Sequence, residues 1–186
     1  IKKFGLEFPL RYFLFKLREW DYISAHRPDY LIANSNFTSR RIKKYWGLNA
    51  EVIHPPVDIK RFKFNLDRDS FYLSVCRLVP NKRVDLLIEA FNKLGLPLSI
   101  VGDGPEKAKL KKIANPNIRF HDNNTNTNVE KLMSTCRAFV YAGIEDFGIA
   151  PIEAMASGAP IIGLAKGGLL DSVNCLTSNS KNKIST

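Results

Sequence analysis

The sequence is poor in cysteine and has no long hydrophobic run. Three cysteines occur among its 186 residues, and they lie far apart without CxxC spacing. An odd, scattered set of this kind argues against a disulfide framework and against a zinc site, so we expect reduced thiols in a cytosolic protein. No apolar stretch approaches the ~18 residues that a membrane-spanning helix requires. The sequence therefore excludes a small disulfide-stabilised protein and offers no candidate membrane span.

Metal-binding and targeting motifs are missing as well. The three histidines, His26, His54 and His121, are scattered and form no HExxH pattern. Asp67 and Asp69 form a DRD sequence, but the pair lies in a polar segment before a predicted strand, so we expect no metal there. The first residues contain neither an initiator Met nor the uninterrupted apolar core of a signal peptide. We therefore interpret the chain as a fragment of a longer protein.

Charge and composition are those of a basic globular protein. Hydrophobic residues make up 45% and charged residues 25% of the chain, whose formal net charge is +10. Residues 1–63 carry much of the excess, with 13 Lys and Arg against 6 Asp and Glu. Such a segment attracts phosphates, anionic membrane surfaces or nucleic acid without choosing among them. Its basic sequence RRIKKYW has no nucleic-acid recognition motif beside it, so we expect no nucleic-acid partner.

From residue 71 onwards, short apolar runs alternate with amphipathic helical segments. The predicted strands are FYLSVCR, PLSIVG, NIRFHD, AFVYAG and PIIGLA, and the predicted helices are VDLLIEAFNKL, PEKAKLKKIA, VEKLMSTC and PIEAMAS. This alternation predicts an α/β domain, a Rossmann-like parallel sheet with helices on both faces. In such a sheet, ligands bind beyond the carboxyl ends of the strands. The loops that follow the strands are therefore where functional residues are expected.

The segment before this domain has a different organisation. It predicts an aromatic-rich helix, a short strand DYLIANS, a basic helix with Thr38 or Ser39 as its N-cap and Gly47 as its C-cap, and a strand that ends at a proline pair. We predict that residues 1–57 are the remnant of another domain and an interdomain segment, that residues 58–173 form the Rossmann-like domain, and that residues 174–186 are a disordered polar tail.

The loop CRLVPNKRVDLL places two cations beside a helix N-terminus. Arg77 follows the strand at once, and Lys82 lies five residues on, just before the helix. A helix N-terminus presents free N–H groups and a partial positive charge, so two nearby cations make an anion site suited to a diphosphate. Two solvated surface cations are the alternative.

Two glycine-containing loops follow other strands. The sequence VGDGPEKAK contains Gly102 and Gly104, but Lys107 occupies the third glycine position of a dinucleotide motif, so we reject nicotinamide binding. The sequence LAKGGLLD contains the pair Gly167 and Gly168 after the last strand. Each loop is compatible with a backbone close to a ligand, and equally with a structural turn.

The sequence IEDFGIAPIEAMASGAPII contains a second anion site and two carboxylates. Pro151 fits the first position of a helix, which makes Ala150 an N-cap without a side-chain acceptor, and Gly148 lets a ligand approach the backbone. An uncapped helix start can bind an anion. Glu153 would be the third helical residue and could simply cap its own helix.

Glu145 has no such structural explanation, because it lies in a loop after a buried strand at the ligand-binding edge of the sheet. Carboxylates repel phosphate, so Glu145 and Glu153 should hold neutral hydroxyl groups. A ligand with hydroxyl groups at both ends and a diphosphate between them is a nucleotide sugar. The combination of loops therefore indicates a nucleotide-sugar site.

These motifs resemble those of family 4 glycosyltransferases of GT-B fold. The resemblance rests on the R-x4-K loop, on IVGDGPE and on EDFGIAPIEAMASGAPII with its E-x7-E spacing, and it runs from about residue 18 to 173. The sequences ANSNFTSRRIKKYWG and VIHPPVDIKRF resemble the segment joining the two domains, especially in mannosyltransferases of polysaccharide and O-antigen assembly. The chain would then be the C-terminal, donor-binding half of such an enzyme.

The resemblance implies residue roles. Arg77, Lys82 and Glu145 would be catalytic, with the two cations on the donor's diphosphate and Glu145 on the transferred sugar, while Glu153 would hold the ribose. With the backbone and glycine positions included, the predicted donor-binding set is Arg77, Lys82, Gly102, Glu145, Phe147, Gly148, Ile149, Glu153, Gly167 and Gly168. Transfer would retain the anomeric configuration, by front-side attack, with no metal ion and no cofactor.

The resemblance also implies the substrates. We expect a nucleotide-sugar donor, GDP-mannose rather than a UDP-sugar, and a glycan or lipid-linked acceptor. The protein would be cytoplasmic, and an N-terminal domain could place it in peripheral contact with the inner face of the membrane. The glycine pair is usually followed by Glu, where this chain has Asp171. Because the acceptor half is missing, we expect the chain alone to be inactive; a nucleotide-sugar-binding module without transfer activity is the alternative.

Overall fold

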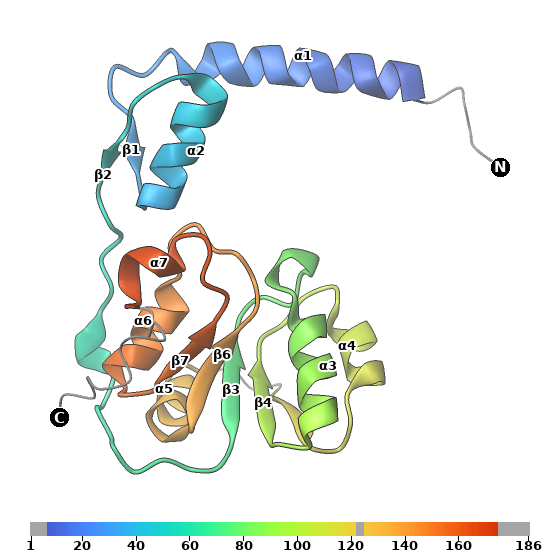
Figure 1. Ribbon diagram of the computed structural model, residues 1–186, viewed down its shortest axis with the longest axis vertical. Helices are drawn as coiled ribbons and strands as arrows, with labels where there is room; N and C mark the ends of the chain where they lie inside the picture. The colour runs from blue at the N-terminus through green and yellow to red at the C-terminus, as the bar shows by residue number, and fades with distance from the viewer. Residues whose placement is uncertain (1–6, 122–124, 175–186) are drawn as a thin grey trace, which may run out of the picture. The chain divides into compact units, whose positions relative to one another are not determined.

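The computed structural model describes residues 7–121 and 125–174 (Figure 1). The chain divides into two compact units, Ile1–His54 and Pro55–Thr186. Of the tail predicted for residues 174–186, all but the first residue lie outside the described part. Within residues 7–121 and 125–174, no helix combines the length and the apolar character that crossing a membrane requires.

The smaller unit is a short parallel β-α-β element preceded by a helix. Its elements are α1 (Glu7–Ala25), β1 (Ile32–Ala33), α2 (Asn36–Trp46) and β2 (Glu51–Val52), with β1 and β2 paired in parallel. The N-cap of α2 is Ser35 rather than Thr38 or Ser39, because the Ser35 hydroxyl accepts a hydrogen bond from the Thr38 amide at 3.0 Å. Gly47, at φ 72°, ends the helix as predicted.

The larger unit is a five-stranded parallel sheet in the order β5-β4-β3-β6-β7 (Figure 1). Its elements are η1 (Ile59–Arg61), β3 (Tyr72–Val75), η2 (Pro80–Lys82), α3 (Val84–Leu94), β4 (Leu98–Val101), α4 (Lys107–Ile113), β5 (Ile118–His121), α5 (Asn126–Thr135), β6 (Ala138–Tyr141), α6 (Ile149–Ala156), β7 (Ile161–Gly163) and α7 (Leu169–Ser172). The strand order reverses between β3 and β6. In sheets of this kind, that reversal marks the crevice where ligands bind.

The sheet separates two hydrophobic cores, one on each face. On one face, α3 and α4 pack against the sheet through Ile88, Phe91 and Leu110. On the other face, Met133 and Ala154 of α5 and α6 pack against side chains of β3, β4 and β6. Successive residues of β6 alternate between these cores, as the pleat of a strand requires. The predicted Rossmann-like sheet with helices on both faces is confirmed.

The segment before β3 is tied to the ends of two helices by a single guanidinium. Arg68 donates hydrogen bonds to the carbonyl oxygens of Met133 at 3.1 Å and Ser157 at 2.5 Å, and also to the carbonyl of Asn65. The Met133 and Ser157 carbonyls lie near the C-terminal ends of α5 and α6, where a cation also interacts favourably with the helix dipole. Arg68 therefore holds α6 at the end opposite to the ligand edge.

We expect Arg68→Met to lower the free energy of unfolding by about 2–3 kcal/mol, because it leaves several helix-end carbonyls without their charged donor. Urea unfolding followed by circular dichroism measures the change. Arg119→Met, at an exposed position of β5, is the matched control and should change stability by less than about 0.5 kcal/mol. Equal stability of the two variants would contradict this role for Arg68.

Candidate functional site

The candidate site is formed by the loops that leave the carboxyl ends of β3 and β6, the two strands at the reversal of the sheet order. The first loop carries Arg77 and Lys82, and the second carries Glu145 and leads into α6. Both loops were predicted from the sequence to be ligand-binding segments. Their strands are hydrogen-bonded neighbours, so side chains from the two loops can meet.

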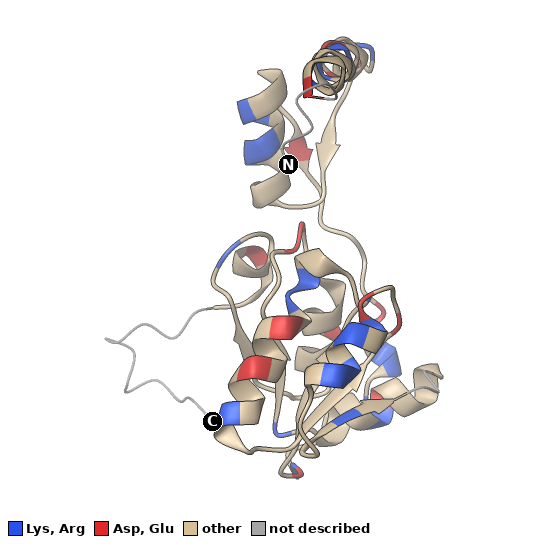
Figure 2. Ribbon diagram, turned by 90° about the vertical axis from the view of Figure 1, so that its right-hand side faces the viewer, with Lys and Arg blue, Asp and Glu red and all other residues tan. Residues whose placement is uncertain are grey.

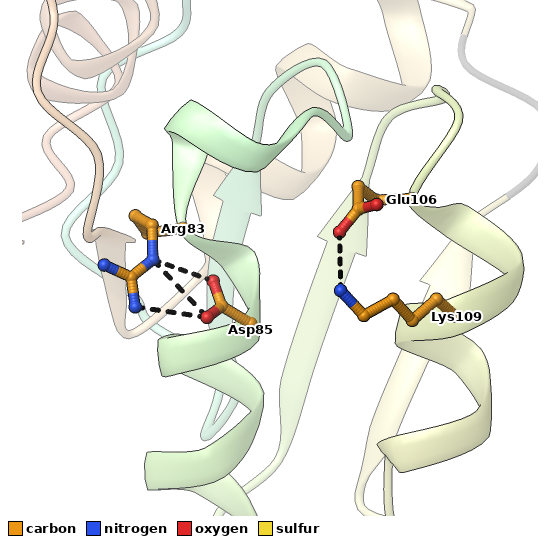
Figure 3. A network of polar contacts seen from close by, with 4 residues as sticks. All are labelled: Arg83, Asp85, Glu106 and Lys109. Carbon is orange, nitrogen blue, oxygen red and sulfur yellow. Dashed lines mark hydrogen bonds and ion pairs between the residues drawn. The ribbon is translucent and has the colours of Figure 1, made fainter. Parts of the chain in front are cut away.

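In the first loop, Arg77 is exposed and Lys82 is partly buried as the last residue of η2. Arg83 follows in the left-handed conformation, at φ 51°, and precedes α3 without capping it by a side chain. Its guanidinium folds back onto Asp85, with Nε 3.2 Å from Oδ1 (Figure 3). The Arg83 guanidinium lowers the pKa of the Asp85 carboxyl. The third cation of this loop is therefore neutralised locally, beside α3.

A similar local pair lies at the start of the neighbouring helix. The Glu106 carboxylate, just before α4, accepts a hydrogen bond from Lys109 Nζ at 3.1 Å (Figure 3). Each pair in Figure 3 joins residues that are close in sequence: one pair lies at the start of α3 and the other at the start of α4. Local ion pairs of this kind near the surface contribute little to stability.

The Gly102 turn packs against the first loop. Gly102 and Gly104 have φ values of 152° and 155°, and a Cβ atom on either would overlap a backbone carbonyl oxygen, of Cys76 and of Leu78 respectively. The Leu78 amide also donates to the carbonyl of Asp103 at 2.8 Å. These contacts give both glycines a structural reason, and they place Gly102 beside the loop that carries Arg77.

The start of α6 differs in detail from the prediction. Its N-cap is Gly148, at φ 93°, rather than Ala150, and Pro151 is the third helical residue rather than the first. Glycine adopts the left-handed conformation without steric cost, and proline is tolerated at the third position because the first-turn N–H groups have no intrahelical partner. No side chain caps this helix start. The predicted uncapped start therefore exists, two residues earlier, and begins at Ile149.

The earlier start changes the position of Glu153. It becomes the fifth helical residue, beyond the third position at which a glutamate caps its own helix. Burial raises the pKa of the Glu153 carboxyl, Arg61 opposes that shift, and Glu130 adds to it. Arg61 is itself bound to Glu130, with Nη2 2.8 Å from Oε1. Glu153 is therefore a half-buried carboxylate without a hydrogen-bonding partner of its own in the described residues.

Glu145 is held by one donor from the first loop and one from the end of β6. Its Oε1 atom accepts hydrogen bonds from Lys82 Nζ and from the Tyr141 hydroxyl. The Lys82 and Glu145 side chains are 18% and 23% exposed. Burial raises the pKa of Tyr141, and the hydrogen bond to Glu145 raises it further, so the phenol stays protonated as a donor. Two residues that the sequence assigned to one site are thus in direct contact.

Gly167 and Gly168 pack against the backbone of the loop that carries Glu145. The Gly168 amide donates to the Glu145 carbonyl at 2.8 Å. A Cβ atom on Gly167 would lie 2.5 Å from that same oxygen, and one on Gly168 would overlap the carbonyl of Asp146. Phe147 anchors the loop in the interior. The pair therefore shapes the acidic loop through its backbone.

The remaining predicted features lie away from this cluster. Asp67 and Asp69 are exposed in the segment before β3, where the Asp67 amide donates to the Asn65 side chain at 3.0 Å. Within the described ranges, no group of three or more His, Cys, Asp or Glu side chains is arranged to hold a metal ion. His121 ends β5, where its Nε2 lies 3.1 Å from the Ser99 hydroxyl.

Sequence reasoning missed Tyr141 and Arg61. Tyr141 was read only as part of a buried strand. Its role could have been suspected from the sequence, because Tyr141 carries a hydroxyl group at the last position of that strand, four residues before Glu145. The contact of Arg61 with Glu130 could not be predicted from the sequence, because the two residues are 69 positions apart.

The raised pKa of Glu153 predicts a pH-dependent stability difference. The folded state binds the Glu153 proton more tightly than the unfolded state does, so this group favours folding at acidic pH and loses that contribution as pH rises through the folded pKa. Glu153→Gln removes the ionisable group. We expect the variant to be more stable than the parent at pH 7, by less than about 1 kcal/mol because solvent screens a half-buried side chain, and equally stable near pH 4.

Urea unfolding at both pH values measures this difference. Glu89→Gln, on the exposed surface of α3, is the matched control and should show no comparable gain at pH 7. A Glu153→Gln variant less stable than the parent at pH 7 would contradict the assignment of an uncompensated carboxylate.

Known proteins resemble this chain in sequence. Residues 57–176 match the family described as Glycosyl transferases group 1. The chain is 28% identical over 158 residues to the uncharacterized glycosyltransferase MJ1178 of Methanocaldococcus jannaschii, covering 80% of the chain and 42% of that protein. It is 25% identical over 214 residues to the alpha-1,3/1,6-mannosyltransferase ALG2 of Candida glabrata, covering 85% of the chain and 47% of that protein.

The fold has counterparts among solved structures. The structure of Anabaena Alr3699/HepE in complex with UDP-glucose matches with a TM-score of 0.75 at 21% identity, covering 86% of this chain and 51% of that one. The chain thus spans about half the length of these proteins, and its parallel sheet with flanking helices has counterparts in GT-B glycosyltransferases. Because the family match covers residues 57–176, which is more than half of the chain, the chain belongs to the group 1 glycosyltransferases.

Proposed function

We propose that this chain provides the donor half of a retaining family 4 hexosyltransferase, which transfers a sugar, mannose in our proposal, from a nucleotide diphosphate to a glycan or lipid-linked acceptor. The observation that carries the proposal is the contact between Lys82 and Glu145 at the reversal of the sheet order. It brings a cation suited to phosphate and a carboxylate suited to sugar hydroxyls to one point, beside the uncapped start of α6.

The proposed chemistry is electrostatic. Arg77, Lys82 and the first N–H groups of α6 would stabilise the negative charge that develops on the diphosphate as its bond to the anomeric carbon breaks. The acceptor oxygen would attack the same face of the sugar, and its proton would pass to the departing phosphate oxygen. Glu145 would orient the sugar through its hydroxyl groups, and Glu153 would hold the ribose. The cations then do the work that a metal ion does in other transferases.

The donor is assigned by analogy with the relatives. The similarity to a mannosyltransferase supports mannose, and we favour GDP-mannose as the donor. A solved neighbour bound to UDP-glucose supports the alternative of a uridine nucleotide. The acceptors would be those of polysaccharide or O-antigen assembly, used in the cytoplasm or at the inner face of the membrane.

A binding module without transfer activity is the second candidate. This candidate is favoured because the chain covers only 42% of the length of MJ1178 and 47% of the length of ALG2. The acceptor would bind to a domain outside that share, so this chain alone would hold a donor without completing a turnover. A nucleic-acid-binding protein is less well supported, because both basic and acidic residues occur on the helices of the larger unit on the side seen in Figure 2.

Calorimetric titration with GDP, UDP and AMP tests the donor site. We expect a nucleoside diphosphate to bind more tightly than AMP, since the cations recognise the second phosphate. Arg77→Ala should weaken diphosphate binding at least about tenfold, as expected for a charge-assisted contact. Arg119→Ala, at an exposed position of β5, is the matched control and should leave binding unchanged.

Two results would overturn the donor site: no diphosphate binding at millimolar concentration, or an Arg77→Ala variant that binds as well as the parent. Transfer is tested separately, with the full-length protein, by release of free GDP or UDP from GDP-mannose or UDP-glucose in the presence of an oligosaccharide or lipid-linked acceptor. Donor binding without release of GDP or UDP above background, with or without an acceptor, would favour the binding module.

We also expect EDTA to leave diphosphate binding unchanged, because Arg77 and Lys82 supply the positive charge that a metal ion would otherwise provide. The same titration with and without EDTA, followed by addition of Mg²⁺ or Mn²⁺, measures this. Loss of binding in EDTA and its recovery with either cation would instead indicate a metal site, and Asp67 and Asp69 would be the residues to test first.

A further inference from the structure

The Glu145 carboxylate carries both of its hydrogen bonds on one oxygen. Lys82 Nζ and the Tyr141 hydroxyl both donate to Oε1. Within the described residues, Oε2 accepts no hydrogen bond. A carboxylate oxygen can accept more than one donor, so this arrangement fixes the plane of the group and keeps the second oxygen available for a ligand hydroxyl.

The two donors differ in what else they must do. In the proposed donor site Lys82 also serves the diphosphate, so its hold on Glu145 weakens when the nucleotide binds. Tyr141 has no such second role, because a neutral phenol is a poor partner for phosphate compared with an ammonium group. Its ring is 3% exposed at the end of β6, which ties the hydroxyl to the sheet.

The backbone around the cluster is built to allow this contact. A Cβ atom on Gly143 would lie 3.0 Å from the Tyr141 hydroxyl and 3.0 Å from Lys82 Cα. A larger residue there would push the two donors apart. The absence of a side chain at Gly143 therefore keeps the β3 and β6 loops close enough for both donors to reach one carboxylate oxygen.

From this arrangement we infer that Tyr141 is a positioning residue for Glu145, which holds the carboxylate toward the sugar of the donor when Lys82 turns to the diphosphate. Tyr141 itself would not touch the donor. The inference rests on the proposed function, and it adds a residue that determines how strongly the site recognises the sugar rather than the nucleotide.

The test separates sugar recognition from nucleotide recognition. Calorimetry would give the affinities of the parent chain and of Tyr141→Phe for GDP and GDP-mannose, and for UDP and UDP-glucose. We expect Tyr141→Phe to keep nucleoside diphosphate affinity within about twofold and to lose about three- to tenfold in affinity for the matching nucleotide sugar. Tyr72→Phe removes a hydroxyl from β3 in the same sheet, where the ring packs against Phe91, and should change neither affinity.

A second variant tests whether Tyr141 acts through Glu145. In a Glu145→Ala background the carboxylate is gone, so adding Tyr141→Phe should produce no further change in the ratio of nucleotide-sugar to nucleoside diphosphate affinity. A merely structural role would lower both affinities together and would persist in that background.

The outcomes distinguish this inference from the proposed function. If the parent chain binds no nucleoside diphosphate, the donor site itself is wrong. If the parent binds but Tyr141→Phe leaves the affinity ratio unchanged, lowers both affinities equally, or still acts without Glu145, the positioning role of Tyr141 is overturned. Selective loss of sugar recognition that disappears in the Glu145→Ala background supports it.

Discussion

The site depends on one partly buried carboxylate that is shared between two strands. Glu145 accepts hydrogen bonds from Lys82, in the loop after β3, and from Tyr141, at the end of β6. A carboxylate removed from water is stable only when charged or hydrogen-bonding partners replace that water. The parallel pairing of β3 and β6 supplies those partners, since it ends both strands at the same edge. The glycines at 143, 167 and 168 then matter because they let three segments approach this group.

Regular, local features of the structure could be predicted from the sequence. The helix VDLLIEAFNKL is α3, Val84–Leu94, because its apolar periodicity and the following glycine define both its face and its end. The order of strands and helices followed from the same alternation. Arg77, Lys82 and Glu145 were predicted because each lies in the loop that follows a strand, and a parallel sheet brings such loops to one edge.

What the sequence could not supply was the choice between equivalent local signals and the long-range contacts. Ser35, Thr38 and Ser39 are all acceptable N-caps, and the chain's entry into α2 from β1 selects Ser35. Pro151 is permitted anywhere in the first helical turn, so it could not distinguish Gly148 from Ala150 as the cap. The contacts of Tyr141 with Glu145 and of Arg61 with Glu130 depend on side-chain directions that only the folded chain fixes.

In the proposed donor site, the same geometry would couple recognition of the two ends of a donor. Without a ligand, the Lys82 ammonium neutralises Glu145, so an incoming diphosphate must compete with an internal partner for this cation. That competition weakens binding of a nucleotide alone, while a donor with a sugar can compensate by giving the released carboxylate new hydroxyl partners. Glu153 differs from Glu145, because burial raises its pKa and, in the described residues, no hydrogen-bonding partner has to be released before a ligand hydroxyl binds. A site whose carboxylates are incompletely satisfied when empty gains most from a ligand that has hydroxyl groups at both ends. If the proposed donor site is correct, the electrostatics of the free protein favour the complete nucleotide sugar over its parts.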